Sequence, residues 1–186
     1  AISNSMRNTL KGRDGFTLVE VVVYASIIGL LSVALLLNLR GVQNNKSVLD
    51  RATNGVISEL RRAQITAISG LNFQGSTVCG YGIHYLDPDT YLIYAGGEAV
   101  CSTANRNYQG GTDFSVQTIK ILESNVEFKG LFNDVFFEPP DPKTFINNSF
   151  SLSGGPLAIS IGFKSQSCPT GCKTVNVHPS GKIDSN

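Results

Sequence analysis

The stretch Gly15–Leu39, GFTLVEVVVYASIIGLLSVALLLNL, decides what this chain can fold into. From Phe16 to Leu39 there are 24 residues, and a single one of them, Glu20, is charged. A helix of that length is about 36 Å long at a rise of about 1.5 Å per residue, which is enough to cross the hydrocarbon core of a bilayer. We therefore predict a membrane-spanning helix over residues 16–39.

Glu20 is the residue in this stretch that needs an explanation. It is the fifth residue after Gly15 and lies inside the apolar run. A carboxylate within a spanning helix costs about 3 kcal/mol on insertion scales. A charge of that cost indicates a function, and we expect its partner to be a cation that becomes available after insertion.

Residues 1–15, which precede the apolar run, have the polar composition of a leader. They carry Arg7, Lys11 and Arg13 against one acid, Asp14. The cytoplasmic flanks of membrane helices carry an excess of Lys and Arg. We therefore predict one membrane pass, with the leader in the cytoplasm and the C-terminal domain periplasmic or extracellular.

The residues around Gly15 also resemble a known signal. KGRDG (11–15) followed by FTLVE (16–20) is similar to the class III signal of type IV prepilins and pseudopilins. The resemblance implies a prepilin peptidase that cleaves between Gly15 and Phe16 and then methylates Phe16. It also implies that Glu20 pairs during assembly with the new amino group of Phe16 on a neighbouring subunit. The alternative, an ordinary signal anchor or an uncleaved membrane helix, leaves Glu20 unexplained.

Residues 40–70 continue the helix with a different pattern. Apolar residues recur at spacings of three and four, as they do on one face of an amphipathic helix. They are Leu49, Ala52, Val56, Leu60, Ala63 and Ala67. Arg51, Glu59, Arg61 and Arg62 lie mostly off that line, and we expect them in solvent. We predict one helix of about 50 residues that ends at Gly70, with its first half in lipid and its second half packed on a domain.

The residue pattern of 71–186 predicts a β-rich domain without a second helix. Alternating apolar and β-branched residues predict seven or eight short strands. We expect them at 78–86, 91–95, 116–122, 126–128, 134–138, 157–163, 173–177 and 182–184. Residues 96–111 and 139–155 are expected to be loops. The predicted fold class is therefore α+β, with one long N-terminal helix packed on an antiparallel, sandwich-like sheet domain.

Four cysteines lie in this domain, beyond the membrane segment. An even number of cysteines in an oxidising compartment fits two disulfides, for which three connectivities exist. We prefer Cys79–Cys101, which flank a predicted hairpin, and Cys168–Cys172, which close a very short loop of turn residues. A metal site is the alternative, but the two pairs are far apart in the sequence and C-x-x-x-C is not a usual zinc spacing. We therefore expect no metal.

The strands of the domain resemble the GspH/FimT family of minor pilins and pseudopilins. The similar segments are YGIHY (81–85), ILESNVEF (121–128), VFFEPP (135–140) and KTVNVHPSGKID (173–184). Major subunits of such filaments often carry a proline in mid-helix, whereas this chain has none before Pro88. The resemblance implies a minor subunit of a type IV pilus or type II secretion pseudopilus. Such a subunit is held in the inner membrane and then assembled with other pilins near the filament tip. The alternative is a tip subunit that binds DNA or another ligand for natural transformation.

The sequence carries no catalytic motif, so we expect neither an enzyme nor a cofactor. His84 lies in a predicted strand and His178 precedes a proline, and neither has a predicted partner for general base catalysis. Asp87 and Asp89 offer oxygen ligands for calcium, but two acids in a tight turn are more often turn formers. Asn147-Asn148-Ser149 (147–149) matches an N-glycosylation acceptor, a pattern short enough to occur by chance.

We do not expect DNA as a direct partner. Useful affinity for DNA requires clustered Lys and Arg. The chain has 15 Lys+Arg and 14 Asp+Glu, and without the leader (15 − 3 and 14 − 1) the numbers are 12 and 13. Lys164, Lys173 and Lys182 are scattered. The tyrosines of the first hairpin, which are able to stack on bases, are expected instead to form one face of a sheet. They are Tyr81, Tyr85, Tyr91 and Tyr94.

Overall fold

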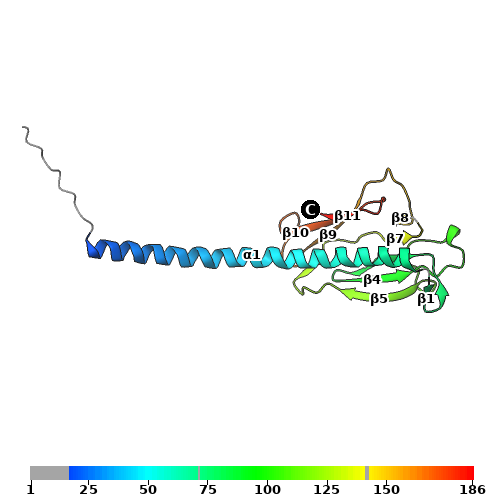
Figure 1. Cartoon of the computed structure of the whole chain (residues 1–186), viewed down its shortest axis with the longest axis horizontal. Helices are drawn as coiled ribbons and strands as arrows, with labels where there is room; N and C mark the ends of the chain where they lie inside the picture. The colour runs from blue at the N-terminus through cyan, green and yellow to red at the C-terminus, as the bar shows by residue number, and fades with distance from the viewer. Residues whose placement is uncertain (1–16, 71, 141–142) are drawn as a thin grey trace, which may run out of the picture. The chain divides into compact units, whose positions relative to one another are not determined.

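The computed structural model describes residues 17–70, 72–140 and 143–186, apart from the side chains of residues 37–45. The chain divides into two compact units, one that ends at Asn44 and one that runs from Asn45 to Asn186. The helix α1 (Leu18–Ser69), 52 residues long, contributes to both units (Figure 1).

The first part of α1, Leu18–Leu36, is apolar on all sides. It is long and apolar enough to cross a membrane, and none of it is buried by the rest of the chain. Its few hydroxyl groups are satisfied within the helix. Ser26 donates a hydrogen bond to the carbonyl of Val22 at 2.8 Å, and Ser32 donates one to the carbonyl of Ile28 at 2.7 Å. A helix that satisfies its own polar groups is one of the two structures that can span lipid.

The second part of α1 buries one face in the domain. The six apolar residues that recur at three and four are all buried, and Leu60 and Ala67 are fully inaccessible. Thr53 is also buried, and its hydroxyl donates to the carbonyl of Leu49 at 2.8 Å. The helix ends at Ser69, and the N–H of Gly70 still donates to the carbonyl of Thr66. The predicted amphipathic helix and its end are therefore confirmed.

The larger sheet has five antiparallel strands in the order β5-β4-β3-β7-β8. The strands are β3 (Tyr81–Asp87), β4 (Thr90–Ala95), β5 (Phe114–Lys120), β7 (Val135–Glu138) and β8 (Lys143–Ile146). β3 and β4 form the predicted hairpin, with Tyr81 opposite Ala95 and Asp87 opposite Thr90. Figure 1 shows β4 and β5 alongside the domain part of α1.

The second sheet has four antiparallel strands in the order β11-β10-β9-β6. They are β6 (Val126–Phe128), β9 (Leu157–Phe163), β10 (Cys172–Val177) and β11 (Ile183–Ser185). A small separate hairpin, β1 (Asn72–Phe73) and β2 (Ser76–Thr77), follows the helix, and a 3-10 turn η1 (Cys101–Thr103) lies in the loop after β4.

One hydrophobic core joins α1 to both sheets. Its members include Leu60 from the helix, Ile83 and Val135 from the larger sheet, and Ile161 and Val175 from the smaller sheet. A second cluster of buried side chains lies apart from it and contains Cys79, Leu92, Tyr94, Ala104 and Phe136. The observed architecture confirms the predicted α+β class with antiparallel sheets.

Two predictions about the strands are wrong. Residues 139–155 are not one long loop, because Lys143–Ile146 pair with β7 as β8. Pro139 and Pro140 cannot continue a ladder, which hid the short strand that follows them. The stretch after the helix also contains β1 and β2. The described residues thus hold eleven strands, in place of seven or eight.

The segments on either side of 123–125 lie in different sheets, because β5 pairs with β4 whereas β6 pairs with β9. One further expectation, that the four hairpin tyrosines form one face of a sheet, is also wrong. Tyr94 does not share a face with the other three. Tyr81 and Tyr91 belong to the core under α1, and Tyr85 packs against that core, whereas Tyr94 belongs to the second cluster. Side chains alternate between the two faces of a strand, and Tyr91 and Tyr94 are three residues apart.

Candidate assembly site

The start of α1 is capped by Thr17. Its hydroxyl oxygen accepts a hydrogen bond from the N–H of Glu20 at 3.3 Å, and its carbonyl accepts one from the N–H of Val21 at 3.2 Å. A threonine three residues before a glutamate is the sequence pattern of a capping box. The pattern is visible in the sequence, but we did not predict the cap from it. The cap shows that the helix can begin next to the expected cleavage point.

Glu20 lies in the first turn of the helix, among exposed apolar side chains. The positive end of the helix dipole favours a carboxylate in that position. Tyr24, four residues on, donates from its hydroxyl to Glu20 Oε1 at 3.5 Å, the long end of the hydrogen-bond range. Positions four apart are neighbours on a helix, so the spacing could have indicated Tyr24. Glu20 therefore keeps acceptor capacity for a further partner.

The expected cleavage between Gly15 and Phe16, and the methylation of Phe16, fall on residues outside those that the structure describes. The structure therefore places the two described residues of the candidate site, Thr17 and Glu20, at the start of an exposed apolar helix. Such an arrangement can offer a carboxylate to a cation of a neighbouring helix in a medium without water.

The cysteines pair as we preferred. Cys79 is bonded to Cys101 and Cys168 to Cys172. The first bond ties the loop after β4 to the residues before β3, and Cys79 is buried. The second closes the short turn between β9 and β10, where Cys168 is exposed. Neither pair lies near Glu20 in the sequence. Both disulfides cross-link the domain and are expected to stabilise its fold.

The loop after β4 is held to the sheet by Arg106. Its Nη2 lies 2.9 Å from Glu138 Oε2 and also donates to the carbonyl of Cys101 at 2.8 Å. The guanidinium carbon lies 4.6 Å from the centre of the Phe145 ring. The carboxylate of Asp113 accepts hydrogen bonds from backbone N–H groups at both ends of this loop, and burial raises the pKa of Asp113. We did not predict a role for Arg106 from the sequence, because its partners come from three separate segments.

Both histidines face aspartates. His84 Nδ1 lies 2.7 Å from Asp134 Oδ1, and Asp134 Oδ2 accepts the N–H of Tyr108 at 2.7 Å. His178 Nε2 lies 3.4 Å from Asp184 Oδ2. Within the described part of the chain, no serine or cysteine side chain forms a hydrogen bond with either histidine. Each histidine therefore has an aspartate partner from another segment, which the sequence did not indicate.

The acidic turn between β3 and β4 forms ion pairs with lysines from other segments. Asp87 Oδ1 accepts the N–H of Asp89, which is the geometry of a turn former. Lys164 and Lys120 both lie within ion-pair distance of Asp89 Oδ2, at 3.3 and 3.4 Å. The hydrogen bond from Lys164 holds the pKa of Asp89 below its ordinary value. Among the residues described, no group of three or more metal-ligating side chains is close enough to hold an ion.

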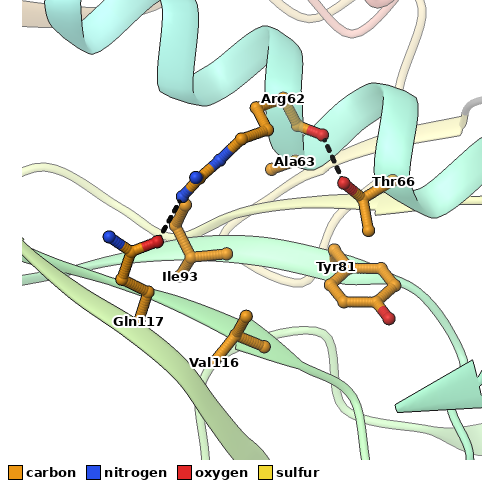
Figure 2. Close-up of a pocket in the computed structure, with 7 residues that line it drawn as sticks. All are labelled: Arg62, Ala63, Thr66, Tyr81, Ile93, Val116 and Gln117. Atoms are coloured by element: carbon orange, nitrogen blue, oxygen red, sulfur yellow. Dashed lines mark hydrogen bonds between the residues drawn. The ribbon is translucent and has the colours of Figure 1, made fainter.

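A cavity of about 220 Å³ lies between α1 and the larger sheet (Figure 2). Arg62 Nη2 donates to Gln117 Oε1 at 2.7 Å and so connects the helix to β5. Ala63, Ile93 and Val116 make the rest of the lining mostly apolar. Arg62 is exposed, as we expected. Its guanidinium also forms an ion pair with Glu59 at 2.8 Å, a contact that we did not predict.

Comparison with known protein families finds a match at the start of the chain. Residues 10–36 match the family model of the prokaryotic N-terminal methylation motif. Together with the exposed apolar helix, the match supports a type IV pilin-like protein with a single membrane anchor. The motif also implies that prepilin peptidase processes the chain and that it assembles with other pilins. Neither a curated protein nor a solved structure matches the chain.

Proposed function

We propose that this pilin-like chain is a minor subunit of a type IV pilus or of a type II secretion pseudopilus, of the GspH/FimT kind. The observation that carries the proposal is the methylation motif over residues 10–36, which includes an exposed apolar helix with Glu20 in its first turn. The subunit is held in the inner membrane by this helix, with its β domain on the periplasmic or extracellular side, until it is assembled near the filament tip.

Processing prepares the assembly site. The peptidase cleaves between Gly15 and Phe16 and methylates Phe16, which creates a positive amino group one residue before the Thr17 cap. Glu20 then meets this group on a neighbouring subunit. Removing one partner from a buried ion pair costs about 3–5 kcal/mol, because the other charge is left unpaired. Four residues separate Phe16 from Glu20, which is about 6 Å of helix rise. The pair therefore sets the axial register between neighbours.

Cohesion comes from the helices and specificity from the domain. The side chains of Leu18–Leu36 are exposed within the chain and gain packing contacts when helices stack. The β domain, held rigid by its core and two disulfides, supplies the surfaces that select partner pilins.

The described residues give no support to a DNA-binding tip subunit. Lys164, Lys173 and Lys182, which we considered for DNA, each lie within 3.3 Å of an aspartate oxygen. Cations already paired with carboxylates release few counterions from DNA.

Cleavage is tested by mass analysis of the N-terminus of protein extracted from membranes. We expect the mature chain to begin at methylated Phe16 in cells with an active prepilin peptidase. Gly15→Val should block processing, because a side chain at that position obstructs the peptidase. A mature protein that still carries residues 13–15 would overturn the proposal.

Assembly is tested with Glu20→Ala. We expect this variant to be processed, inserted and folded, yet to be lost from sheared filaments and from complexes with partner pilins in membranes. Ser26→Ala is the matched control, because the Ser26 hydroxyl bonds only within its own helix. Undiminished incorporation of Glu20→Ala would require the register mechanism to be withdrawn.

A further inference from the structure

The largest exposures among the domain's described apolar side chains belong to two leucines in loops. Leu122, which follows β5, is 91% exposed, and Leu131, which follows β6, is 84% exposed. Leu86, next to the end of β3, is 44% exposed. We call Leu86, Leu122 and Leu131 the leucine tip. None of the three belongs to either buried cluster.

The three leucines surround one turn of the chain, Asp87–Thr90. The N–H of Ile121, next to Leu122, donates to the carbonyl of Asp89 at 2.8 Å. The N–H of Phe128 donates to the carbonyl of Pro88 at 2.6 Å, and Leu131 and Pro88 both line an open surface groove of about 310 Å³. Residues far apart in the sequence therefore present leucines at the same end of the domain.

This is also the end at which α1 enters the domain. Arg51 Nε lies 2.8 Å from Glu123 Oε1, so the loop that carries Leu122 contacts the first turns of the domain part of α1. In Figure 1 the arrowhead of β5 lies at this end. The predicted span ends at Leu39, and five residues (40–44) separate it from Asn45, where the domain begins. This end of the domain is therefore joined to the span by a short stretch of chain.

The charges at this end are nearly balanced. Among the described residues, five cations here lie within ion-pair distance of four carboxylates. The pairs are Arg51 with Glu123, Lys120 and Lys164 with Asp89, Lys129 with Glu127, and Lys173 with Asp50. An almost neutral surface gives little attraction to anionic lipid. The apolar side chains must therefore supply most of any interaction with a membrane.

We propose that the leucine tip docks the domain on the surface of the bilayer, with Leu122 and Leu131 inserted into the interfacial region. The inference rests on the proposed role as a subunit held in the membrane before assembly. The short tether singles out the bilayer as the occupant, because every copy of the domain is brought to it by its own helix. Apolar side chains that reach the boundary between headgroups and acyl chains are stabilised there. Extraction into a filament then has to release this contact.

The chain contains no tryptophan, which permits a direct test. Leu122→Trp and Leu131→Trp each introduce a single tryptophan, which is excited selectively over the six tyrosines, at a highly exposed position. The full chain carrying either substitution is reconstituted into vesicles of zwitterionic phospholipid, with and without brominated acyl chains. Emission wavelength then reports polarity, and quenching by bromine reports contact with lipid.

Leu152→Trp is the matched control. Leu152 is 71% exposed in the loop that leads to the start of β9. β9 runs from Leu157 to Phe163, about 20 Å, and Lys164 at its far end contacts Asp89 of the turn. The control therefore lies in a loop toward the opposite end of the domain, in the same protein and with the same substitution.

We expect blue-shifted emission and strong bromine quenching for Leu122→Trp and Leu131→Trp, and neither effect for Leu152→Trp. Added anionic lipid should change the quenching little, because the charges are balanced. Emission from both tip variants that matches the control would overturn the proposal. A blue shift without bromine quenching would also overturn it, since it would indicate contact with protein. The vesicles contain no peptidase and no partner pilin, so a failure here leaves the filament test of Glu20→Ala unaffected.

Discussion

The two halves of α1 have the same backbone and opposite surroundings. Leu30 in the first half is 74% exposed, whereas Leu60 in the second half is fully buried. Apolar residues surround the first half on every side and form one stripe on the second. A stripe can be covered by a single domain, and here both sheets cover it. A helix that is apolar on all sides needs a medium that covers every side, and lipid or a bundle of neighbouring helices is such a medium.

Polar side chains follow the same division. In the first half, Ser26 and Ser32 bond to carbonyls of their own helix. In the second half, Arg61 donates to the carbonyl of Ile183, and Gln64 donates to the carbonyl of Gly181 at 3.1 Å. Apart from Glu20, the polar side chains named in the first half find their hydrogen-bond partners within the helix. Those of the second half bond to backbone carbonyls of residues 181–183, near the C-terminus.

The largest effect expected is on the buried stripe. Leu60→Ala should destabilise the domain by about 2–5 kcal/mol, because it leaves a cavity in the core. Leu30→Ala removes the same atoms from the exposed half and should leave the unfolding midpoint of the domain unchanged. Denaturant unfolding of the full chain in detergent micelles measures both. Equal losses of unfolding free energy for Leu60→Ala and Leu30→Ala would show that the two halves contribute equally to the domain's stability.

The disulfides should stabilise the domain and leave the first half of α1 unaffected. Opening a loop of 22 residues by replacing Cys79 and Cys101 with serine should cost about 3 kcal/mol. The same change at Cys168 and Cys172 opens a loop of four and should cost about 2 kcal/mol. Unfolding midpoints with and without reductant test this order. A larger loss from the short loop would contradict it.

The cap at Thr17 should matter only at the start of the first half. Thr17→Val removes the hydroxyl that accepts the N–H of Glu20 and should cost the first turn about 1 kcal/mol. Faster amide exchange at Glu20 and Val21 in micelles, with unchanged domain unfolding, is the expected result. Unchanged exchange at both amides would show that Thr17 is not the cap.

The smallest effect expected is acid destabilisation of the domain. Hydrogen bonds from Lys164 and Lys182 hold the pKa values of Asp89 and Asp184 below the ordinary 3.8. The stability from these pairs is present above pH 3.8 and is lost as the pH falls through the lowered pKa values. The domain's unfolding midpoint should therefore drop below pH 4, and less so in Asp89→Asn with Asp184→Asn. An equal drop in that double variant would exclude these pairs as the cause.

Several features of this protein could be predicted from local sequence pattern alone. The apolar run with Glu20, the stripe from Leu49 to Ala67, the hairpin of β3 and β4, and the two cysteine pairs all follow from residues near one another in the chain. Local rules of periodicity, turn chemistry and loop length were sufficient for them. The Thr17 cap is equally local, and its pattern can be read from residues 17–20.

Local pattern could not indicate which strands share a sheet and which loops come into contact. Val126 pairs with Phe163, 37 positions away in the sequence (163 − 126), whereas β6 does not pair with β5, its neighbour along the chain. Arg106 likewise meets Glu138, and Leu122 and Leu131 flank the same turn, across segments that are separate in the sequence. Such contacts depend on how a common core brings distant segments together. Each partner alone has the pattern of an ordinary loop or strand, so the sequence could not indicate them.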